Sequence, residues 1–385
     1  MVMVFVKKFI SIVFEVLILP VLIFFLILSK FKQKKIDVGL GPEPLINNIY
    51  HKKALQAYNY TAETFTDVPY SITSDFDIIL SSKFKFIPIK IKLLLFFIVS
   101  LFRYKCIYIY FNGGLLYQTI LLWKIEPFLY KFSGVKVVVM PYGSDIQNMS
   151  LSNNLYLKHC YSKDYPLHRK KLTQIYKKCN LWTDYGDHII SGCEWVDYMH
   201  YWDTLMLGHF SIDTNLWKPE INKSSKKIRI LHAPNHRMLK GTRIFINIIN
   251  ELIQDGFPFE LQLLEKVTNS EIKTAIAKAD IIADQLVGGW YAMFAIEAMA
   301  MEKPVICYLR KDLEELYIKA GLIDLGEIPI INCNPLTIKQ QLIDVSNNRE
   351  QLKNLGIKSR QFVLKHHSLK ATGKVFKKIN ESILN

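Results

Sequence analysis

The sequence predicts an α/β protein with two doubly wound domains that face one another across a cleft, preceded by an apolar membrane segment. Three observations support this fold class. The chain has 385 residues, which suits two domains of about 150–200 residues better than one compact core. Short strands alternate with helices, and several strands end in glycine-bearing loops, as in parallel sheets covered by helices on both faces. The alternation stops at residues 217–227, a polar stretch, and then starts again.

The first element is an apolar segment. In Phe9–Leu28, twenty residues long, only Ser11, Glu15 and Pro20 are not apolar, and a helix of about 20 residues crosses a membrane. Lysines follow it instead of a small-residue cleavage site, which disfavours a cleaved signal peptide and places its carboxyl side in the cytoplasm. Because a carboxylate at mid-membrane is costly, a helix that lies in the interface or re-enters is an alternative. A buried core helix fits least, since the segment precedes the first folded unit and has little to pack against.

Positive charge is concentrated in two apolar stretches. The formal net charge is +15; residues 1–35 carry six lysines against one acid, and residues 78–125 carry seven basic residues and no acid. Basic residues within apolar sequence are typical of a membrane surface, whereas nucleic-acid patches are basic and polar. We therefore expect a protein at the cytoplasmic face of the cell membrane, with no nucleic-acid partner. The six cysteines form no CxxC pair, so neither a zinc site nor a disulfide framework is expected.

The first domain is expected to span residues 36–217, after a membrane-associating segment at 1–35. Strands are predicted at 36–40, 106–111 and 135–140, and a helix from Ile49 to Tyr58. The loops that end these strands contain candidate residues for the wall of the cleft, although each loop also fits ordinary turn chemistry. These candidates are Gly39, Gly41, Glu43, Asn112, Gly113, Gly114 and Asp145, of which Asp145 is the candidate base.

The second domain is expected to span residues 218–385. Strands are predicted at 228–233, 259–264, 280–284 and 304–308, and helices at 240–255, 270–279, 292–301 and 336–345, with two helical stretches after them. Asn334 and Pro335 fit the cap and first position of the helix at 336–345. The polar stretch 217–227 fits a hinge. Two such domains leave a cleft at the carboxyl ends of their strands, where ligands bind in open α/β sheets.

Two loops of the second domain point to a bound anion. His236, Arg237 and Lys240 lie between a strand and a helix, where cations and helix N–H groups together suit a nucleotide diphosphate. Taken alone, this loop also fits a solvated basic turn. In the second loop, a Gly-Gly pair leaves the start of the next helix open to a ligand. Glu297 lies in that helix among small apolar residues and could accept hydrogen bonds from ribose hydroxyls, or could form a surface salt bridge.

Three stretches of this region resemble signatures of the group 1 glycosyltransferases, which are retaining enzymes of the GT-B fold. Residues 297–306, EAMAMEKPVI, resemble the family's "EAMA-x-G-x-PVI" segment. Residues 239–242, LKGT, resemble its "KG" donor-phosphate element, and residues 211–219, SIDTNLWKP, resemble the "GVDT-x-x-F-x-P" segment that enters its hinge. The three occur in the family's order over residues 208–310, whereas the first domain resembles the family only in layout. That layout implies that the loop residues of the first domain named above form the acceptor side of the cleft, with Asp145 as the candidate base or acceptor-hydroxyl ligand.

The resemblance implies transfer of a sugar from a nucleotide-sugar to an acceptor hydroxyl, with retention of the anomeric configuration. Glu297 matches the carboxylate that holds the donor ribose, and Lys240 matches the lysine that neutralises the diphosphate. The loop Gly288, Gly289, Trp290 and Tyr291 matches the segment whose backbone wraps the donor. The resemblance implies neither a metal nor a cofactor, because cations and a helix terminus stabilise the leaving diphosphate.

The sequence departs from the family pattern at three places. Gly289 stands eight residues before Glu297, where the family usually has a second glutamate, so contacts to the donor sugar must come from elsewhere. Asn235 and Pro234 occupy the usual positions of an arginine, and we expect Arg237 to substitute for it. Glu302 replaces the glycine of the "EAMA-x-G" pattern.

Together these observations predict a membrane-associated glycosyltransferase that acts on a lipid-linked or glycan acceptor in surface polysaccharide or lipopolysaccharide biosynthesis. One alternative is an enzyme like the sugar-nucleotide epimerases, which needs neither an acceptor nor a membrane element. A second alternative is a non-catalytic GT-B scaffold, which the glycine at position 289 would suit.

Overall fold

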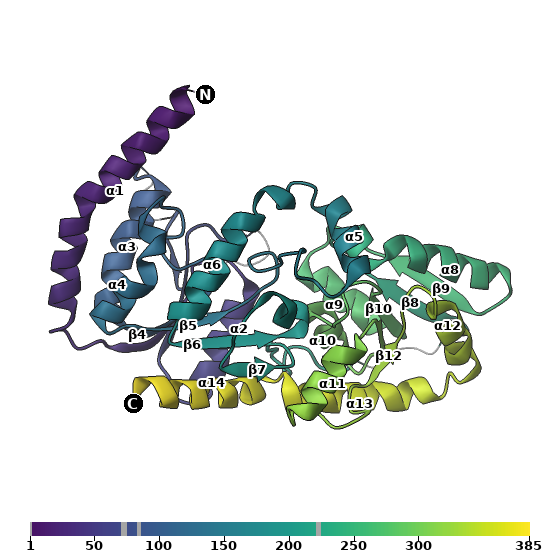
Figure 1. The fold of residues 1–385 in the computed structure, drawn as a ribbon. Coiled ribbons are helices and arrows are strands. Elements are labelled where there is room, and N and C mark those ends of the chain that lie inside the picture. Colours follow the sequence, from purple (N-terminus) through teal and green to yellow (C-terminus); the bar gives the residue numbers. More distant parts are fainter. Residues whose placement is uncertain (1, 71–74, 83–85, 221–224) are drawn as a thin grey trace.

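The computed structural model describes residues 2–70, 75–82, 86–220 and 225–385 and contains two α/β domains side by side (Figure 1). The strands of the first domain are β1 (Ile36–Leu40), β2 (Ala62–Thr66), β3 (Ile78–Ile79), β4 (Tyr104–Tyr110), β5 (Lys136–Met140), β6 (His188–Gly192) and β7 (Thr204–Met206). Those of the second are β8 (Ile228–His232), β9 (Phe259–Leu263), β10 (Ile281–Gln285), β11 (Val305–Cys307) and β12 (Ile330–Asn332).

Within these residues both sheets are parallel throughout. The first has the order β3-β2-β1-β4-β5-β6-β7 and the second β12-β11-β10-β8-β9. In each sheet the strand order reverses beside the first strand, which is the doubly wound topology that puts loops at the carboxyl ends of the strands around a crevice. The predicted fold class is therefore confirmed.

Helices cover both faces of the sheets. In the first domain they are α1 (Val2–Ser29), α2 (Ile46–Gln56), α3 (Ile89–Arg103), α4 (Glu126–Ser133), α5 (Leu155–Asp164) and α6 (Leu172–Tyr185), with the short 3-10 helices η1 (Leu122–Lys124), η2 (His168–Lys170) and η3 (Cys193–Tyr198). After β8 come α7 (Arg237–Lys240), α8 (Thr242–Gln254), α9 (Asn269–Lys278), α10 (Met293–Ala300), α11 (Lys311–Lys319), α12 (Ile338–Asn347), α13 (Gln351–His366) and α14 (Leu369–Leu384).

The sequence of β4 explains why helices lie on both sides of the first sheet. Tyr108 and Tyr110 belong to a buried cluster with residues of α2 and α14. Ile107 and Ile109, which point the other way because side chains alternate along a strand, belong to the cluster that includes α3 and α4. A strand buried on both faces is apolar at consecutive positions, as β4 is.

The last helix, α14, packs on the first domain although the sequence suggested that residues 218–385 form the second. It lies against α2 (Figure 1), and Phe376 and Ile379 are buried beside Val38 and Leu40 of β1. Burial of these apolar side chains holds the end of the chain against the first domain. The predicted hinge at 217–227 joins the two domains, and its residues 221–224 lie outside the described residues.

Two predicted helices of the second domain differ from the observed ones. The helix predicted at 240–255 begins at Thr242 as α8, because Gly241 has a left-handed backbone with φ of 72° and separates it from α7, which ends at Lys240. The helix predicted at 336–345 begins at Ile338, because the Asn334 side chain accepts the N–H groups of Leu336 and Thr337 and holds these residues in a turn.

Helix α1 lies along the outer side of the first domain and contacts α3 and α4 (Figure 1). Its residues Lys8–Ser29 form the one described helix that is long and apolar enough to cross a membrane. Leu22 and Leu26 are buried against the domain, so the expectation that this segment has little to pack against was wrong. Only 17% of the apolar window is buried, however, which distinguishes α1 from a core helix.

The acidic residue of this apolar helix, Glu15, is tolerated because it is bonded to the first domain. Its carboxylate is buried and accepts the backbone N–H groups of Ile120, Leu121 and Leu122 at 2.7–3.3 Å, where η1 begins. The first N–H groups of a helical turn have no partner within it, so a carboxylate is well suited to them. Glu15 therefore faces the domain and fastens α1 to it.

We expect the Glu15→Ala variant to be less stable than the wild type by about 1–3 kcal/mol, because buried N–H groups lose their acceptor. Urea unfolding in mild detergent measures the difference. Ser11→Ala is the matched control, since it removes only the hydroxyl that donates to Glu15 at 3.2 Å. Equal stability of Glu15→Ala and Ser11→Ala would show that the carboxylate does not fasten the helix.

Candidate functional site

A cavity of about 610 Å³ lies between the two domains, at the carboxyl ends of their strands. The loops after β5 and β6 and helix α5 form one wall, and the loops after β8 and β10 and the start of α10 form the other. Its wall includes Tyr142, Ser144, Gln147, Tyr161, Tyr165 and Glu194 from the first domain, and Asn235, His236, Lys240, Gln285, Gly288, Trp290, Tyr291, Ala292 and Met293 from the second.

Lys240 is held at the cavity wall by a buried carboxylate. It ends α7, and its ammonium group donates to Asp284 Oδ1 at 2.6 Å. Asp284 lies on β10 and its side chain is fully buried, whereas Lys240 is partly open to the cavity. An ammonium group has three donors, so this ion pair orients Lys240 and leaves donors for a bound anion.

The start of α10 adds unpaired backbone donors beside the cavity. Its cap residue, Ala292, has no side chain that could accept them. Among the described residues, the N–H groups of Met293, Phe294 and Ala295 have no acceptor, and Ala292 and Met293 line the cavity together with Lys240. A cation beside open helix N–H groups forms an anion-binding site.

Glu297 lies one turn further along α10 than Met293. It is 8% exposed and makes no hydrogen bond or ion pair within the described residues. Burial, together with the nearby charge of Asp284, raises the pKa of its carboxyl group to about 8. A buried acid without a partner is costly to the fold, and such groups are concentrated at binding sites.

Arg237 does not join Lys240 at the cavity. Its guanidinium group is exposed and forms two hydrogen bonds to Glu265, at 2.9 and 2.8 Å. This orientation gives no support to the prediction that it substitutes for the family's arginine.

Trp290 and Tyr291 connect the two domains through their side chains. Trp290 Nε1 donates to the carbonyl of Leu207 at 2.7 Å. The Tyr291 hydroxyl is bonded to His367 at 2.9 Å, and His367 Nδ1 is 3.1 Å from the carbonyl of Phe210. Both aromatic side chains are buried, so the prediction that the loop serves a donor through its backbone is compatible with the geometry.

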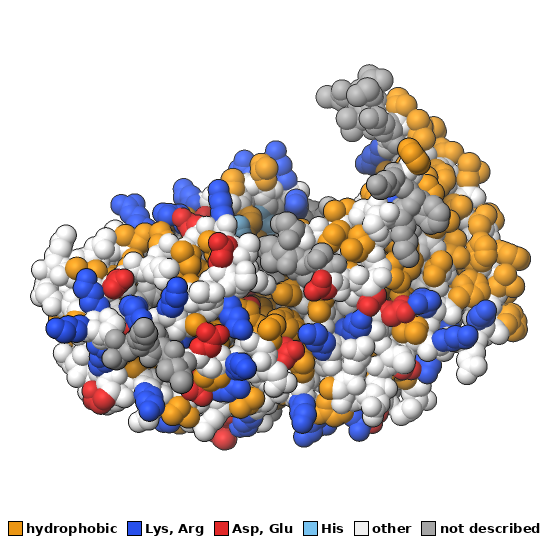
Figure 2. Space-filling view, turned by 180° about the vertical axis from the view of Figure 1, so that it is seen from behind, with side chains coloured by type: hydrophobic (Ala, Val, Ile, Leu, Met, Phe, Trp, Pro, Cys, Tyr) orange, Lys and Arg blue, Asp and Glu red, His pale blue; other side chains and the backbone are white. Residues whose placement is uncertain are grey.

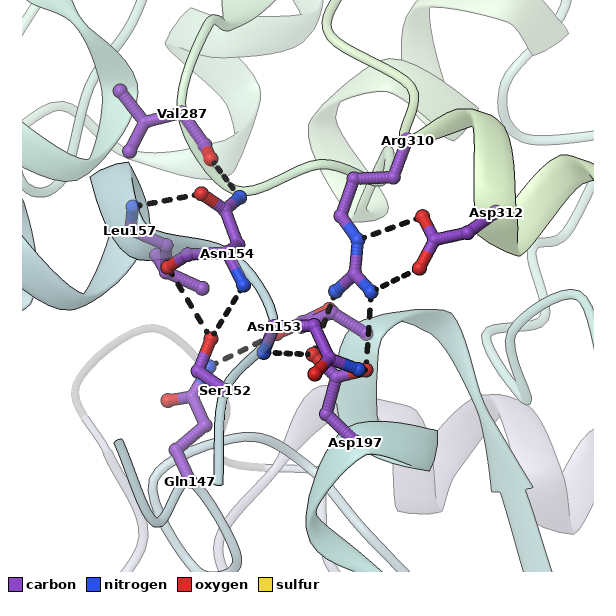
Figure 3. Close-up of polar contacts among 10 residues, drawn as sticks. Gln147, Ser152, Asn153, Asn154, Leu157, Asp197, Val287, Arg310 and Asp312 are labelled. Atoms are coloured by element: carbon purple, nitrogen blue, oxygen red, sulfur yellow. Dashed lines mark hydrogen bonds and ion pairs between the residues drawn. The ribbon is translucent and has the colours of Figure 1, made fainter. Parts of the chain in front are cut away.

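Arg310 fills the space beside Gly289, and Figure 3 shows its guanidinium group bonded to Asp197 and Asp312. Gly289 has a φ of 90°, and a Cβ atom there would lie 2.6 Å from Arg310 Cδ. The buried guanidinium group bridges to Asp197 of the first domain at 2.6 and 3.1 Å, and Asp312 binds it from the other side. Nearby, Asn154 Nδ2 donates to the carbonyl of Val287 at 2.7 Å. An interdomain ion pair therefore stands close to the position where the family usually has its second glutamate.

Asp145 connects two loops instead of facing the cavity. Its Oδ1 accepts the N–H groups of Tyr142 and Gly143, and its Oδ2 accepts that of Phe111, at 2.9–3.0 Å. The side chain is buried, and burial raises its pKa to about 7. With both oxygens occupied by backbone donors, its contacts give no support to the prediction of a base or hydroxyl ligand.

Asn112 is the predicted acceptor-side residue that reaches an open pocket. Its amide donates to Glu43 at 2.6 Å and to the Tyr142 hydroxyl at 2.7 Å, and its carbonyl accepts Lys178 Nζ at 2.6 Å. Burial raises the pKa of Glu43. The pocket, about 490 Å³, shares Tyr142, Ser144, Tyr161 and Tyr165 with the interdomain cavity, and His168, Lys171 and Lys178 also line it.

The predicted glycines of the first domain serve packing. A Cβ atom at Gly39 would press on the ring of Tyr104, and one at Gly41 would overlap the carbonyl of Phe65. Gly113 has a φ of 109°, which favours glycine. A side chain at Gly114 would meet the carboxylate of Glu126.

Glu194 is a cavity residue that the sequence did not reveal. It lies on η3, lines the interdomain cavity and accepts Gln147 Nε2 at 2.9 Å. Burial raises the pKa of its carboxyl group to about 7. Because it faces the cavity from the wall opposite Lys240, it is available to a ligand's hydroxyl groups. The described residues contain no group of three or more side chains that could hold a metal ion.

Comparison with solved structures identifies the fold. A sucrose-phosphate synthase from Thermosynechococcus elongatus superimposes with a TM-score of 0.59 at 12% identity, covering 91% of this chain and 99% of that one. HepE from Anabaena, in complex with UDP-glucose, gives 0.56 at 11% identity over 90% and 99% of the two chains. A glycosyltransferase from Rickettsia africae gives 0.56 at 12% identity over 92% and 99%. No protein-family model and no curated protein sequence matches the chain. The chain thus has the two-domain GT-B fold.

Proposed function

We propose that this protein is a glycosyltransferase that moves a sugar from a nucleotide-sugar donor to an acceptor hydroxyl. The observation that carries the proposal is Lys240, held by Asp284 at the interdomain cavity beside the open N–H groups of α10. This arrangement suits the diphosphate of a nucleotide-sugar. The fold shared with a structure that holds UDP-glucose supports the same donor class.

Each donor-side group has one part in the proposed reaction. Lys240 and the start of α10 bind the diphosphate and stabilise the charge that develops when the bond from the anomeric carbon to phosphate breaks. Glu297 accepts hydrogen bonds from the ribose hydroxyls. The acceptor oxygen bonds to the anomeric carbon, and its proton passes to the leaving diphosphate, with retention of configuration. This reaction requires no metal or cofactor.

The acceptor side and the exposed surface of α1 support a substrate at a membrane. The 490 Å³ pocket opens beside the interdomain cavity and is lined by Lys171 and Lys178, so an anionic group of an acceptor suits it. Helix α1 exposes apolar side chains along most of its length. We propose a lipid-linked or glycan acceptor at the cytoplasmic face of the membrane, in surface polysaccharide or lipopolysaccharide biosynthesis.

A thermal-shift panel of nucleoside diphosphates tests the donor site. A diphosphate present at about 100 times its dissociation constant stabilises the protein by about 2.7 kcal/mol, because it binds only the native state. The matching nucleoside without phosphates is the control and shifts the melting temperature much less, since it does not reach Lys240. The absence of a shift with every diphosphate would contradict the proposal. Product formed from the nucleotide-sugar alone, without an acceptor, would instead favour an epimerase.

A further inference from the structure

We propose that α1 lies flat in one leaflet of an anionic bilayer, in the membrane plane, and does not cross it. The proposal rests on the membrane association included in the proposed function and adds the topology of the chain. It follows from three properties of α1: the side chains that it exposes, the side by which it is attached to the domain, and the lysines at its ends.

The outward side of α1 is apolar from Phe9 to Leu28. Ile10, Leu17 and Phe24 are 60%, 71% and 58% exposed, and residues seven apart lie on one face because a helix has 3.6 residues per turn. Figure 2 shows hydrophobic side chains gathered along this helix. Further exposed members of the same surface are Phe9, Val13, Phe14, Val16, Val21, Ile23, Ile27 and Leu28. Between Phe9 and Leu28 the sequence has one charged residue, Glu15, and it is turned toward the domain.

The attachment of α1 to the domain is incompatible with a crossing. The segment that would span the bilayer, Phe9–Leu28, is held to the domain at Glu15, Leu22 and Leu26. A crossing of about 30 Å needs all of its roughly 20 residues clear of water-soluble structure. In the packed arrangement, η1, α3 and α4 would have to enter the hydrocarbon with it. An in-plane helix keeps the attachment and buries only its outward side.

Helix α3, which packs against α1, is not suited to cross the hydrocarbon of a bilayer. It is 15 residues long, which corresponds to about 22 Å, and carries Lys90, Lys92 and Arg103. At an interface the same helix is favourable, since it exposes Ile91, Leu95 and Val99 beside α1.

Lysines at the ends of α1 and beside it identify an anionic lipid surface as the partner. Lys8 precedes the apolar surface, Lys30 and Lys32 follow it, and all three are exposed. Lys90 of α3 lies 3.9 Å from Glu15 and is also partly exposed. Each basic residue near an anionic membrane contributes about 1 kcal/mol. A second copy of this chain would bring like charges together at these positions, whereas acidic headgroups neutralise them.

The position of α1 in the molecule then orients the enzyme. The helix lies on the side of the first domain that is remote from the second (Figure 1). An in-plane α1 therefore places the first domain on the membrane and leaves the domain that holds Lys240 in water, where a soluble nucleotide-sugar is available.

Depth measurement at three positions tests the topology. An environment-sensitive fluorophore is attached to the new thiol of each of three full-length variants, Ile10→Cys, Leu17→Cys and Phe24→Cys. The labelled proteins are bound to phosphatidylcholine vesicles that contain about 30% phosphatidylglycerol. The six native cysteines are buried, so the label selects the new thiol. Lipids brominated at different depths quench the three labels equally if α1 is in plane. Crossing predicts depths that differ by about 10 Å at each step of seven residues. Leu336→Cys, on the second domain and exposed, is the unquenched control.

Any result other than equal quenching of the three labels contradicts a specific part of the proposal. A label at Leu17 that lies about 10 Å deeper than the labels at Ile10 and Phe24 would overturn the in-plane topology and leave membrane association intact. Failure to bind the vesicles at all would overturn both. If the labels are shielded from water in the absence of lipid, and sedimentation shows that the protein is a dimer, a second copy of the chain covers α1. Diphosphate binding, measured by thermal shift on the same variants, reports separately on the glycosyltransferase proposal, because the labelled positions are remote from Lys240.

Discussion

Replacing Lys240 with alanine is expected to lower the rate of sugar transfer by about 10²–10³-fold, the loss seen when one preorganised donor to a developing negative charge is removed. Lys240 is fixed at the cavity wall by Asp284, so it needs no reorganisation when the diphosphate leaves. The rate constant for transfer with saturating donor measures the effect.

The stability of this variant must be followed in the same experiment. Alanine leaves the buried Asp284 carboxylate unpaired, which costs about 3–5 kcal/mol when one partner of a buried ion pair is removed. Lys240→Gln separates the two effects, because its amide can still donate to Asp284 but carries no charge. We expect Lys240→Gln to fold normally and to be as slow as Lys240→Ala.

Arg237→Ala is the matched control, since it removes a neighbouring cation that points to Glu265 and away from the cavity. Its transfer rate is expected to stay within about two-fold of the wild type, as for a surface substitution. If Lys240→Gln retains the wild-type rate, or if Arg237→Ala is equally slow, Lys240 is not the donor-phosphate residue.

The Glu297→Gln variant is expected to bind the nucleotide more weakly and yet to be more stable at pH 8 than the wild type. A hydrogen bond to a charged group is worth about 1.5–3 kcal/mol, so we expect the dissociation constant of the nucleoside diphosphate that binds to rise by about 10–100-fold. Comparison with the same diphosphate lacking a ribose hydroxyl tests the contact directly. The wild type should discriminate between the two ligands, and Glu297→Gln should not.

The stability change follows from the pKa of Glu297. Its value is about 8 in the folded protein, against 4.5 for an ordinary glutamate. Below pH 4.5 the carboxyl is protonated in both the folded and the unfolded protein. Between 4.5 and about 8 the unfolded protein ionises first, so the free energy of unfolding falls by up to about 1.4 kcal/mol per pH unit. Above pH 8 the carboxyl is ionised in both the folded and the unfolded protein, so the free energy of unfolding no longer falls for this reason.

Glutamine has no proton to lose, so the variant lacks this contribution. The difference in the free energy of unfolding between Glu297→Gln and the wild type should therefore grow steadily from pH 5 to pH 8. Urea unfolding at several pH values measures it. A constant difference across this range would mean that Glu297 is ionised or well paired in the native protein.

Sequence patterns predicted the parts of the fold that depend on local composition. Four of the five strands of the second domain were predicted to within one or two residues at each end, because buried parallel strands are short apolar runs with turn residues after them. Strands β3, β7 and β12 were missed, since two or three residues are too few to show a pattern. Strands β2 and β6 were missed as well, because polar residues such as Glu63 and Ser191 interrupt their apolar runs. The packing of α14 on the first domain was not predicted, because its partner α2 lies more than three hundred residues earlier.

The site residues also divide into those with a local sequence signal and those placed by contacts between distant segments. Lys240 could be placed beside an anion site because the strand, the basic loop and the helix start are consecutive in the sequence. The orientation of Arg237 depends on Glu265, and the carboxylate of Asp145 is taken up by the N–H of Phe111 as well as by its own loop. Glu194 has no local signal, because only the folding of two domains brings it to the wall opposite Lys240.

The packing of α14 on the first domain has a consequence for the order of folding during synthesis. Phe376 and Ile379 cover the face of the first sheet that contains Val38 and Leu40. A ribosome adds about 5–20 residues per second, so tens of seconds separate the emergence of β1 from that of α14. During this interval α2 covers only part of this face, and the part that Phe376 and Ile379 cover stays open to water. The first domain to be made is therefore the last to be completed, and a chain that stops before residue 369 leaves an apolar face for chaperones to recognise.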